Sequence, residues 1–143
     1  MPWVNAILLA AAMNVTDSAA PQGGEVELVC HTVYFTLKEP TRANIDQFVA
    51  SCRKHSSKHE GAIFFACGER AEGPAGPFKD KDFHVSQTII FRGRESVEAY
   101  MKSDARQRFV DECKPLWSKV RVFESNLRGM EMPAVKSAEP NRK

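Results

Sequence analysis

The chain lacks a dominant charge. Lys and Arg number 20, Asp and Glu number 18, and the formal net charge is +2. No basic stripe with interleaved aromatic residues occurs, and such stripes are what neutralise a phosphate backbone. We therefore expect no nucleic-acid partner.

Long apolar runs are also missing. The longest, Ala6–Met13, is far short of the ~20 residues that a membrane-spanning helix needs. No Lys or Arg precedes it, as one would in a secretory signal peptide. We expect no membrane partner and a cytoplasmic protein whose residues 1–24 are an extension and linker. Export is the alternative if the run is a signal peptide.

Cysteines are few and widely spaced, with no CxxC pair. They are Cys30, Cys52, Cys67 and Cys113. Each lies in an apolar periodic stretch, which favours reduced, buried thiols over a disulfide framework. Cys52, His55 and His59 have a spacing that brings them near one helix face, but histidines at a Lys-rich helix end are more typical of a polar face. We expect neither a metal nor a cofactor.

The 143 residues, 43% of them hydrophobic, suit one domain with one core. Small residues, Pro21, Gly23 and Gly24 mark a linker before the domain, which we place at 25–127. Residues 128–143 are polar, contain two prolines and are expected to be disordered.

Hydrophobic periodicity predicts six elements within the domain. Alternation predicts strands, and an i, i+3, i+4, i+7 stripe predicts a helix. The expected strands are 29–37, 61–67, 83–91 and 120–123, and the expected helices are 42–57 and 96–101, the latter continued to 113 after a cap at Ser103 or Asp104. Gln87 is the one polar candidate for burial in the third strand.

This order is βαββαβ, an α+β ferredoxin-like fold with an antiparallel four-stranded sheet. Helices on one face leave the other face uncovered, and we expect that face to carry many of the apolar strand residues. A soluble monomer rarely exposes so much apolar surface, so we expect a homodimer whose two sheets close into an α/β barrel.

Several short segments carry a family resemblance. They are His31-x-Val33-x-Phe35, then Ile89-Ile90-Phe91 with Glu95–Tyr100, then Phe109, and finally Val120-Arg121-Val122. In this order they resemble the stress-responsive dimeric A/B barrel family, from about residue 26 to 124. The resemblance implies the dimeric barrel and suggests a small apolar or aromatic ligand.

Within that family the chain resembles olivetolic acid cyclase, where an imidazole on the helix after a tyrosine is the base and the tyrosine hydroxyl assists. This resemblance makes His31 and Tyr100 the candidate catalytic residues. The family pattern after the tyrosine reads His-Pro-x-His, whereas this chain has Ser103-Asp104-Ala105-Arg106. Arginine stays protonated at neutral pH and cannot be a base. We therefore favour a non-catalytic protein, with a cyclase-like or monooxygenase-like, cofactor-independent enzyme as the alternative.

The resemblance also implies a pocket between sheet and helices. Its expected lining is Val33, Phe35, Phe48, Val49, Gln87, Ile89, Arg106, Phe109, Trp117, Val120 and Val122. A core closed by these same side chains is the alternative. His31 either accepts a proton from a ligand or is held by a backbone carbonyl or by Tyr100. Arg106 either holds an anion or lies exposed on its helix.

Overall fold

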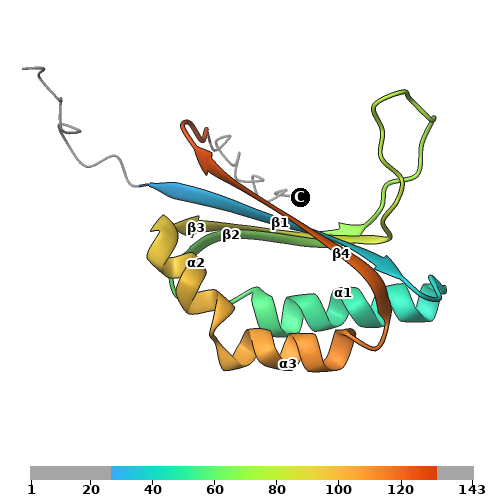
Figure 1. The fold of residues 1–143 in the computed structure, drawn as a ribbon, viewed down its shortest axis with the longest axis horizontal. Coiled ribbons are helices and arrows are strands. Elements are labelled where there is room, and N and C mark those ends of the chain that lie inside the picture. The colour runs from blue at the N-terminus through green and yellow to red at the C-terminus, as the bar shows by residue number, and fades with distance from the viewer. Residues whose placement is uncertain (1–26, 132–143) are drawn as a thin grey trace, which may run out of the picture.

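The computed structural model describes residues 27–131, so the expected extension 1–24 and most of the expected tail lie outside the described residues. Residues 27–131 form four strands and three helices (Figure 1). In chain order these are β1 (Leu28–Leu37), α1 (Arg42–Ser56), β2 (Ala62–Glu69), β3 (Val85–Arg92), α2 (Gly93–Met101), α3 (Asp104–Cys113) and β4 (Trp117–Leu127).

The strands make one antiparallel sheet in the order β2-β3-β1-β4. All three helices lie on one face of it (Figure 1). The predicted α+β ferredoxin-like fold is therefore confirmed. No helix among the described residues has the length and apolar character needed to cross a membrane.

Expected and observed elements differ most at β4. The expected strand was 120–123, whereas β4 pairs with β1 along its whole length, from Leu28 opposite Leu127 to Leu37 opposite Trp117. Polar residues fill the second half of β4, where alternation of apolar residues no longer marks a strand. Backbone pairing with β1 extends the strand nonetheless.

A break near Lys102 separates α2 from α3. Ser103 has an extended backbone, and its hydroxyl accepts a hydrogen bond from the backbone N–H of Arg106. The same hydroxyl donates to the backbone oxygen of Tyr100. Ser103 thus ends one helix and caps the next, as its residue type predicts. The break turns α3 away from the direction of α2 (Figure 1).

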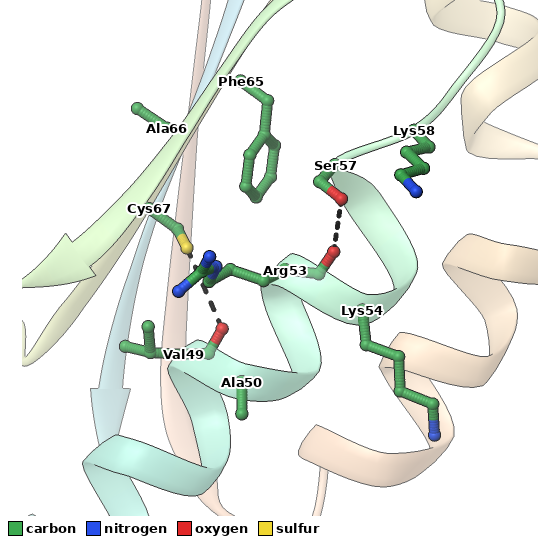
Figure 2. A pocket seen from close by; sticks show the side chains of 9 residues that line it. All are labelled: Val49, Ala50, Arg53, Lys54, Ser57, Lys58, Phe65, Ala66 and Cys67. Atoms are coloured by element: carbon green, nitrogen blue, oxygen red, sulfur yellow. Dashed lines mark hydrogen bonds between the residues drawn. The ribbon is translucent and has the colours of Figure 1, made fainter. Parts of the chain in front are cut away.

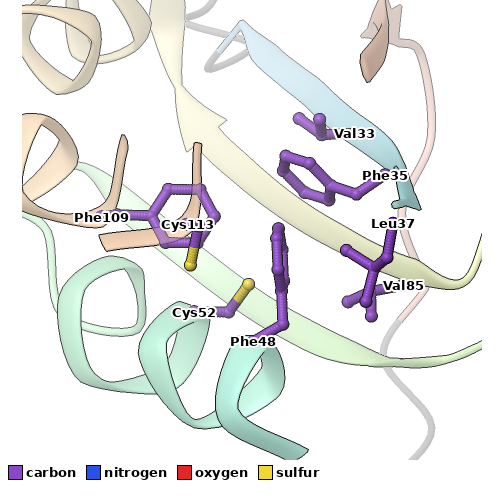
Figure 3. Packing of buried hydrophobic residues seen from close by; sticks show 8 residues of the cluster. All are labelled: Val33, Phe35, Leu37, Phe48, Cys52, Val85, Phe109 and Cys113. Carbon is purple, nitrogen blue, oxygen red and sulfur yellow. The ribbon is translucent and has the colours of Figure 1, made fainter. Parts of the chain in front are cut away.

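Two apolar clusters fill the space between sheet and helices. The larger consists of Val33, Phe35, Leu37, Phe48, Cys52, Val85, Phe109 and Cys113 (Figure 3). In it the Phe35 ring lies 4.7 Å from the Phe48 ring and 5.7 Å from the Phe109 ring, centroid to centroid. The smaller consists of Val29, Ile89, Phe91, Val97 and Tyr100 and lies under α2.

The opposite face of the sheet differs from the expectation. Alternation points the apolar residues of β1, such as Val33 and Phe35, toward the helices, so they cannot also enrich the other face. That face carries hydroxyls, with Thr32 and Thr88 hydrogen bonded across β1 and β3 at 3.3 Å. Its largest exposed apolar side chain is Phe123, which is 55% exposed. The face is therefore mixed rather than broadly apolar.

The segment from 70 to 84, between β2 and β3, packs onto this mixed face. The Phe83 ring meets the Tyr34 ring edge-on at 4.8 Å. Arg121 donates to an Asp80 carboxylate oxygen at 2.6 Å, and this contact lowers the pKa of Asp80. The segment is thus held against one end of the sheet by an aromatic pair and an ion pair.

Candidate functional site

A cavity of about 350 Å³ lies between the sheet and the α2–α3 pair. Its lining consists of His31, Val33, Phe35, Gln87, Tyr100, Met101, Arg106, Phe109, Val110, Lys114, Trp117, Val120 and Val122. Phe35 and Phe109 belong to the larger apolar cluster and Tyr100 to the smaller, so the cavity lies where the two clusters adjoin. The void exists where the helical layer breaks between α2 and α3.

His31 stands on β1 with its side chain toward the helices and is 4% exposed. Its Nδ1 lies 2.9 Å from Oε1 of Glu124, the residue directly opposite it on β4. The second carboxylate oxygen of Glu124 accepts a hydrogen bond from Arg94 at 2.7 Å. Hydrogen bonds from Arg94 and from His31 lower the pKa of Glu124. The imidazole is therefore held by an ionised carboxylate, and not by a backbone carbonyl or by Tyr100.

This contact fixes the role of each imidazole nitrogen. An ionised carboxylate only accepts hydrogen bonds, so Nδ1 of His31 carries the hydrogen and donates it to Glu124. In the neutral imidazole, Nε2 then keeps its lone pair and can accept a proton. The pair of His31 and Glu124 is thus chemically competent for proton transfer.

Tyr100, on α2, is 2% exposed and its ring meets the His31 ring edge-on at 6.1 Å. Its hydroxyl accepts a hydrogen bond from Nε2 of Gln87 at 3.2 Å and lies 3.1 Å from the hydroxyl of Ser56. Tyr100 and His31 are therefore neighbours through their rings, while the phenol is bound to other partners.

Gln87, on β3, is 1% exposed, and the prediction that it is buried in a strand holds. Its amide nitrogen is used by Tyr100, but its amide oxygen has no hydrogen-bond partner among the described residues. Buried polar atoms are rarely left without a partner. The oxygen is buried behind the wall of the cavity, where none of the described residues satisfies it.

The remaining polar side chains of the lining are cationic. Arg106, in the first turn of α3, is partly buried, and Lys114, at the end of α3, is exposed. Neither side chain makes an ion pair or a side-chain hydrogen bond within residues 27–131. No Asp or Glu lines the cavity, so its lining carries a positive charge.

Three of the residues expected in the pocket lie elsewhere. Phe48 and Ile89 are fully buried in the two apolar clusters, because facing aromatic and aliphatic side chains fill those parts of the interior. Val49 borders a different depression of about 890 Å³ between α1 and β2 (Figure 2). The Cys67 thiol lies there, 3.8 Å from the backbone oxygen of Val49. The other expected residues surround the 350 Å³ cavity together.

Four residues of the site were not predicted: Met101, Val110, Lys114 and Glu124. Val110 and Lys114 follow Arg106 at i+4 and i+8, a helical spacing that was present in the sequence. Glu124 continues the alternation of Val120 and Val122 on β4 and was missed because the expected strand ended at residue 123.

The structure does not bring the three spaced metal-ligand candidates together. Cys52 is fully buried in the larger cluster, and His55 binds Glu112 at 2.8 Å. The His59 ring instead packs against the Tyr100 ring at 5.4 Å. Within the described part of the chain, no group of three His, Cys, Asp or Glu side chains is placed to hold a metal ion.

Comparison with solved structures shows what this fold resembles. A protein of the same domain family from Mesorhizobium loti is 22% identical, with a TM-score of 0.60 over 72% of this chain and 99% of that chain. A dimeric ferredoxin-like protein of unknown function from Thermobifida fusca is 12% identical, with a TM-score of 0.61 over 72% and 93%. The hydroxynitrile lyase of Passiflora edulis is 19% identical, with a TM-score of 0.61 over 75% and 99%. No curated protein matches the chain.

At these identities the structural matches establish the fold alone. The sequence itself also matches a family profile, the stress responsive A/B barrel domain, over residues 29–127. That match covers more than half of the chain and includes every strand and helix from Val29 to the end of β4. The chain therefore belongs to the stress responsive A/B barrel domain family.

Proposed function

We propose that this domain binds a small, mainly apolar molecule in the cavity between the sheet and the α2–α3 pair. The observation that carries the proposal is a void of about 350 Å³ lined by apolar side chains with a few convergent polar groups. Small-molecule sites have this composition and begin at about this size. A side-chain-filled core would leave no such volume.

The test is calorimetric titration of the protein with a panel of small aromatic compounds. Val110→Phe places a ring on the cavity wall and should abolish binding, since Val110 lines the void. Gln107→Phe, on the exposed side of the same helix, is the matched control and should bind normally. Equal binding by Val110→Phe and the unchanged protein would show that ligands occupy another place.

We infer that the domain works as a homodimer paired through the mixed sheet face. The protein from Thermobifida fusca, which shares the fold, is described as dimeric. In this chain Phe64 and Phe123 on that face are 39% and 55% exposed, so both rings are accessible to a partner. Pairing two such faces would bury these rings.

Sedimentation equilibrium tests the pairing. Phe123→Glu should shift the protein toward the single-chain mass. Val122→Glu is the matched control, because Val122 is similarly exposed, at 52%, but points toward the helices. A single-chain mass for the unchanged protein at micromolar concentration would contradict the dimer.

A second candidate function is proton transfer by His31, in a cyclase-like, lyase-like or monooxygenase-like reaction without a cofactor. The observation that favours it is the contact of His31 with Glu124, which leaves Nε2 available as an acceptor. An imidazole held by a carboxylate is the arrangement that general-base catalysis uses. The Passiflora edulis protein of this fold is a hydroxynitrile lyase, so the fold supports catalysis in at least one relative.

Hydrogen–deuterium exchange beside the carbonyl of small aryl ketones tests this candidate. His31→Gln should abolish any protein-dependent exchange. His55→Gln is the control, because His55 also contacts a carboxylate, Glu112, but does not line the cavity. If His31→Gln still catalyses the exchange, His31 is not the base. The proposed binding function would be unaffected by that result.

A further inference from the structure

We propose that the cavity selects a carboxylate-bearing ligand, with the acid group held at the α3 side by Arg106 and Lys114. This inference rests on the proposed binding function and specifies its ligand class. The charge of the lining and the spacing along α3 each support it.

The charge of the lining is one-sided. Arg106 and Lys114 border the void, and no acidic side chain does. Two arginines near the sheet are neutralised within the protein: Arg94 by Glu124 and Arg121 by Asp80. Arg106, although partly buried, has no such partner among residues 27–131. A carboxylate from outside would supply the missing negative charge, and the planar guanidinium matches its two oxygens.

The spacing along α3 places both cations at one wall. Arg106, Val110 and Lys114 follow one another at intervals of four residues, and all three line the void. Two intervals correspond to about 12 Å along a helix, so Arg106 lies about one turn before Val110 and Lys114 about one turn after it. An acid group that lies over Val110 is then within the field of both. The body of the ligand faces Phe109, Trp117 and Val33.

The closing experiment compares four probes of one shape by calorimetry: 4-hydroxybenzoate, its neutral amide 4-hydroxybenzamide, the cation 4-hydroxybenzylamine, and benzoate without the hydroxyl. The acid should bind at least tenfold more tightly than the amide, and the amine least tightly. Benzoate, which keeps the acid group, should also bind more tightly than the amide. Raising the salt concentration should reduce the preference for the acid, since a partly exposed ion pair is screened.

Substitutions on α3 test which residues give the preference for the acid over the amide. Arg106→Gln should remove most of the preference for the acid over the amide, and Lys114→Gln should remove a smaller part of it. Arg108→Gln, an exposed position on the same helix that does not line the cavity, removes the same charge and should keep the preference. A preference that is unchanged in Arg106→Gln, or that falls equally in Arg108→Gln, would overturn the assignment of the acid group to Arg106.

The failures are distinguishable. If the acid and the amide bind the unchanged protein equally, the selectivity is refuted while the binding function stands. If none of the four probes, nor toluene, binds at millimolar concentration, the binding function fails together with the inference.

Discussion

Gln87→Met should make the protein more stable. Methionine has nearly the same length and shape as glutamine but no amide, so it removes the buried oxygen that has no partner among the described residues. Burying a polar atom without a hydrogen bond costs about 1–3 kcal/mol. The substitution also removes the hydrogen bond from Gln87 to Tyr100, which is worth about 0.5–1.5 kcal/mol net.

The balance is favourable because Tyr100 keeps a partner. Its hydroxyl lies 3.1 Å from the Ser56 hydroxyl, so loss of the amide does not leave it unpaired. We therefore expect Gln87→Met to raise the free energy of unfolding by about 1 kcal/mol. For a domain of this size that corresponds to a rise in Tm of roughly 4–8 °C.

Tyr100→Phe provides the opposing change. It removes the acceptor for the Gln87 nitrogen and would leave both ends of that amide unpaired in the interior. We expect a loss of about 1–3 kcal/mol. When Gln87 is already methionine, the same Tyr100→Phe substitution should cost much less, and this difference is the coupling that a double-mutant cycle measures.

Urea denaturation of the four proteins, followed by circular dichroism at neutral pH, gives the required free energies. A stability loss of 1 kcal/mol or more in Gln87→Met would refute the reasoning, because it would mean that the amide oxygen is satisfied in solution. Additive effects of the two substitutions would refute the coupling between Gln87 and Tyr100.

Three further substitutions test the described structure by the same urea method. Phe48→Ala should cost about 3–5 kcal/mol, because Phe48 is fully buried among aromatic rings; a loss under 1 kcal/mol would contradict that packing. Hydrogen bonds from Ser51 and His55 lower the pKa of Glu112 from its ordinary 4.5 to about 2, so these bonds stabilise the fold above pH 4.5 and are lost as the pH falls toward 2. Glu112→Gln should therefore be destabilising at pH 6 and nearly neutral near pH 2, and a constant difference across that range would refute the shift. Gly61→Ala should be destabilising, because Gly61 has a φ of +83° and an added methyl would overlap the Ser96 side chain of α2; unchanged stability would contradict this turn.

The fold was predictable because its apolar patterns are local. Alternation in β1 and the helical stripe of α1 appear directly in the sequence, and Ser103 marks the helix break by its residue type. Strand length in β4 was not predictable, since pairing with β1 and not residue type sets it. The expectation for the uncovered sheet face was wrong for a related reason: many apolar strand residues were expected on that face, although alternation gives those of β1 to the helix side.

The sequence predicted the lining of the candidate site where the lining follows from the inward faces of the strands and helices. Most expected lining residues surround one void because the sheet face and the inner helix face follow from periodicity. Phe48 and Ile89 were expected to line the cavity but lie in the packed clusters. Periodicity predicts that a side chain is buried but not whether it fills space or borders a void. Glu124 was not predicted, because its contact with His31 joins residues far apart in the chain. That contact depends on the register between β1 and β4, which the sequence alone does not give.

In the proposed proton-transfer function, the arginine at the position of the helix imidazole leaves the sheet wall of the cavity, and not the helix wall, to supply the base. Arg106 remains charged at neutral pH and can bind an acid but cannot accept a proton. The imidazole of His31 stands on the sheet, where β4 supplies Glu124 to orient it. A ligand anchored on α3 by its acid group would therefore extend its other end toward β1. Binding strength would then depend on the helix wall and proton transfer on the sheet wall, so substitutions at Arg106 and His31 would alter different properties of the same cavity.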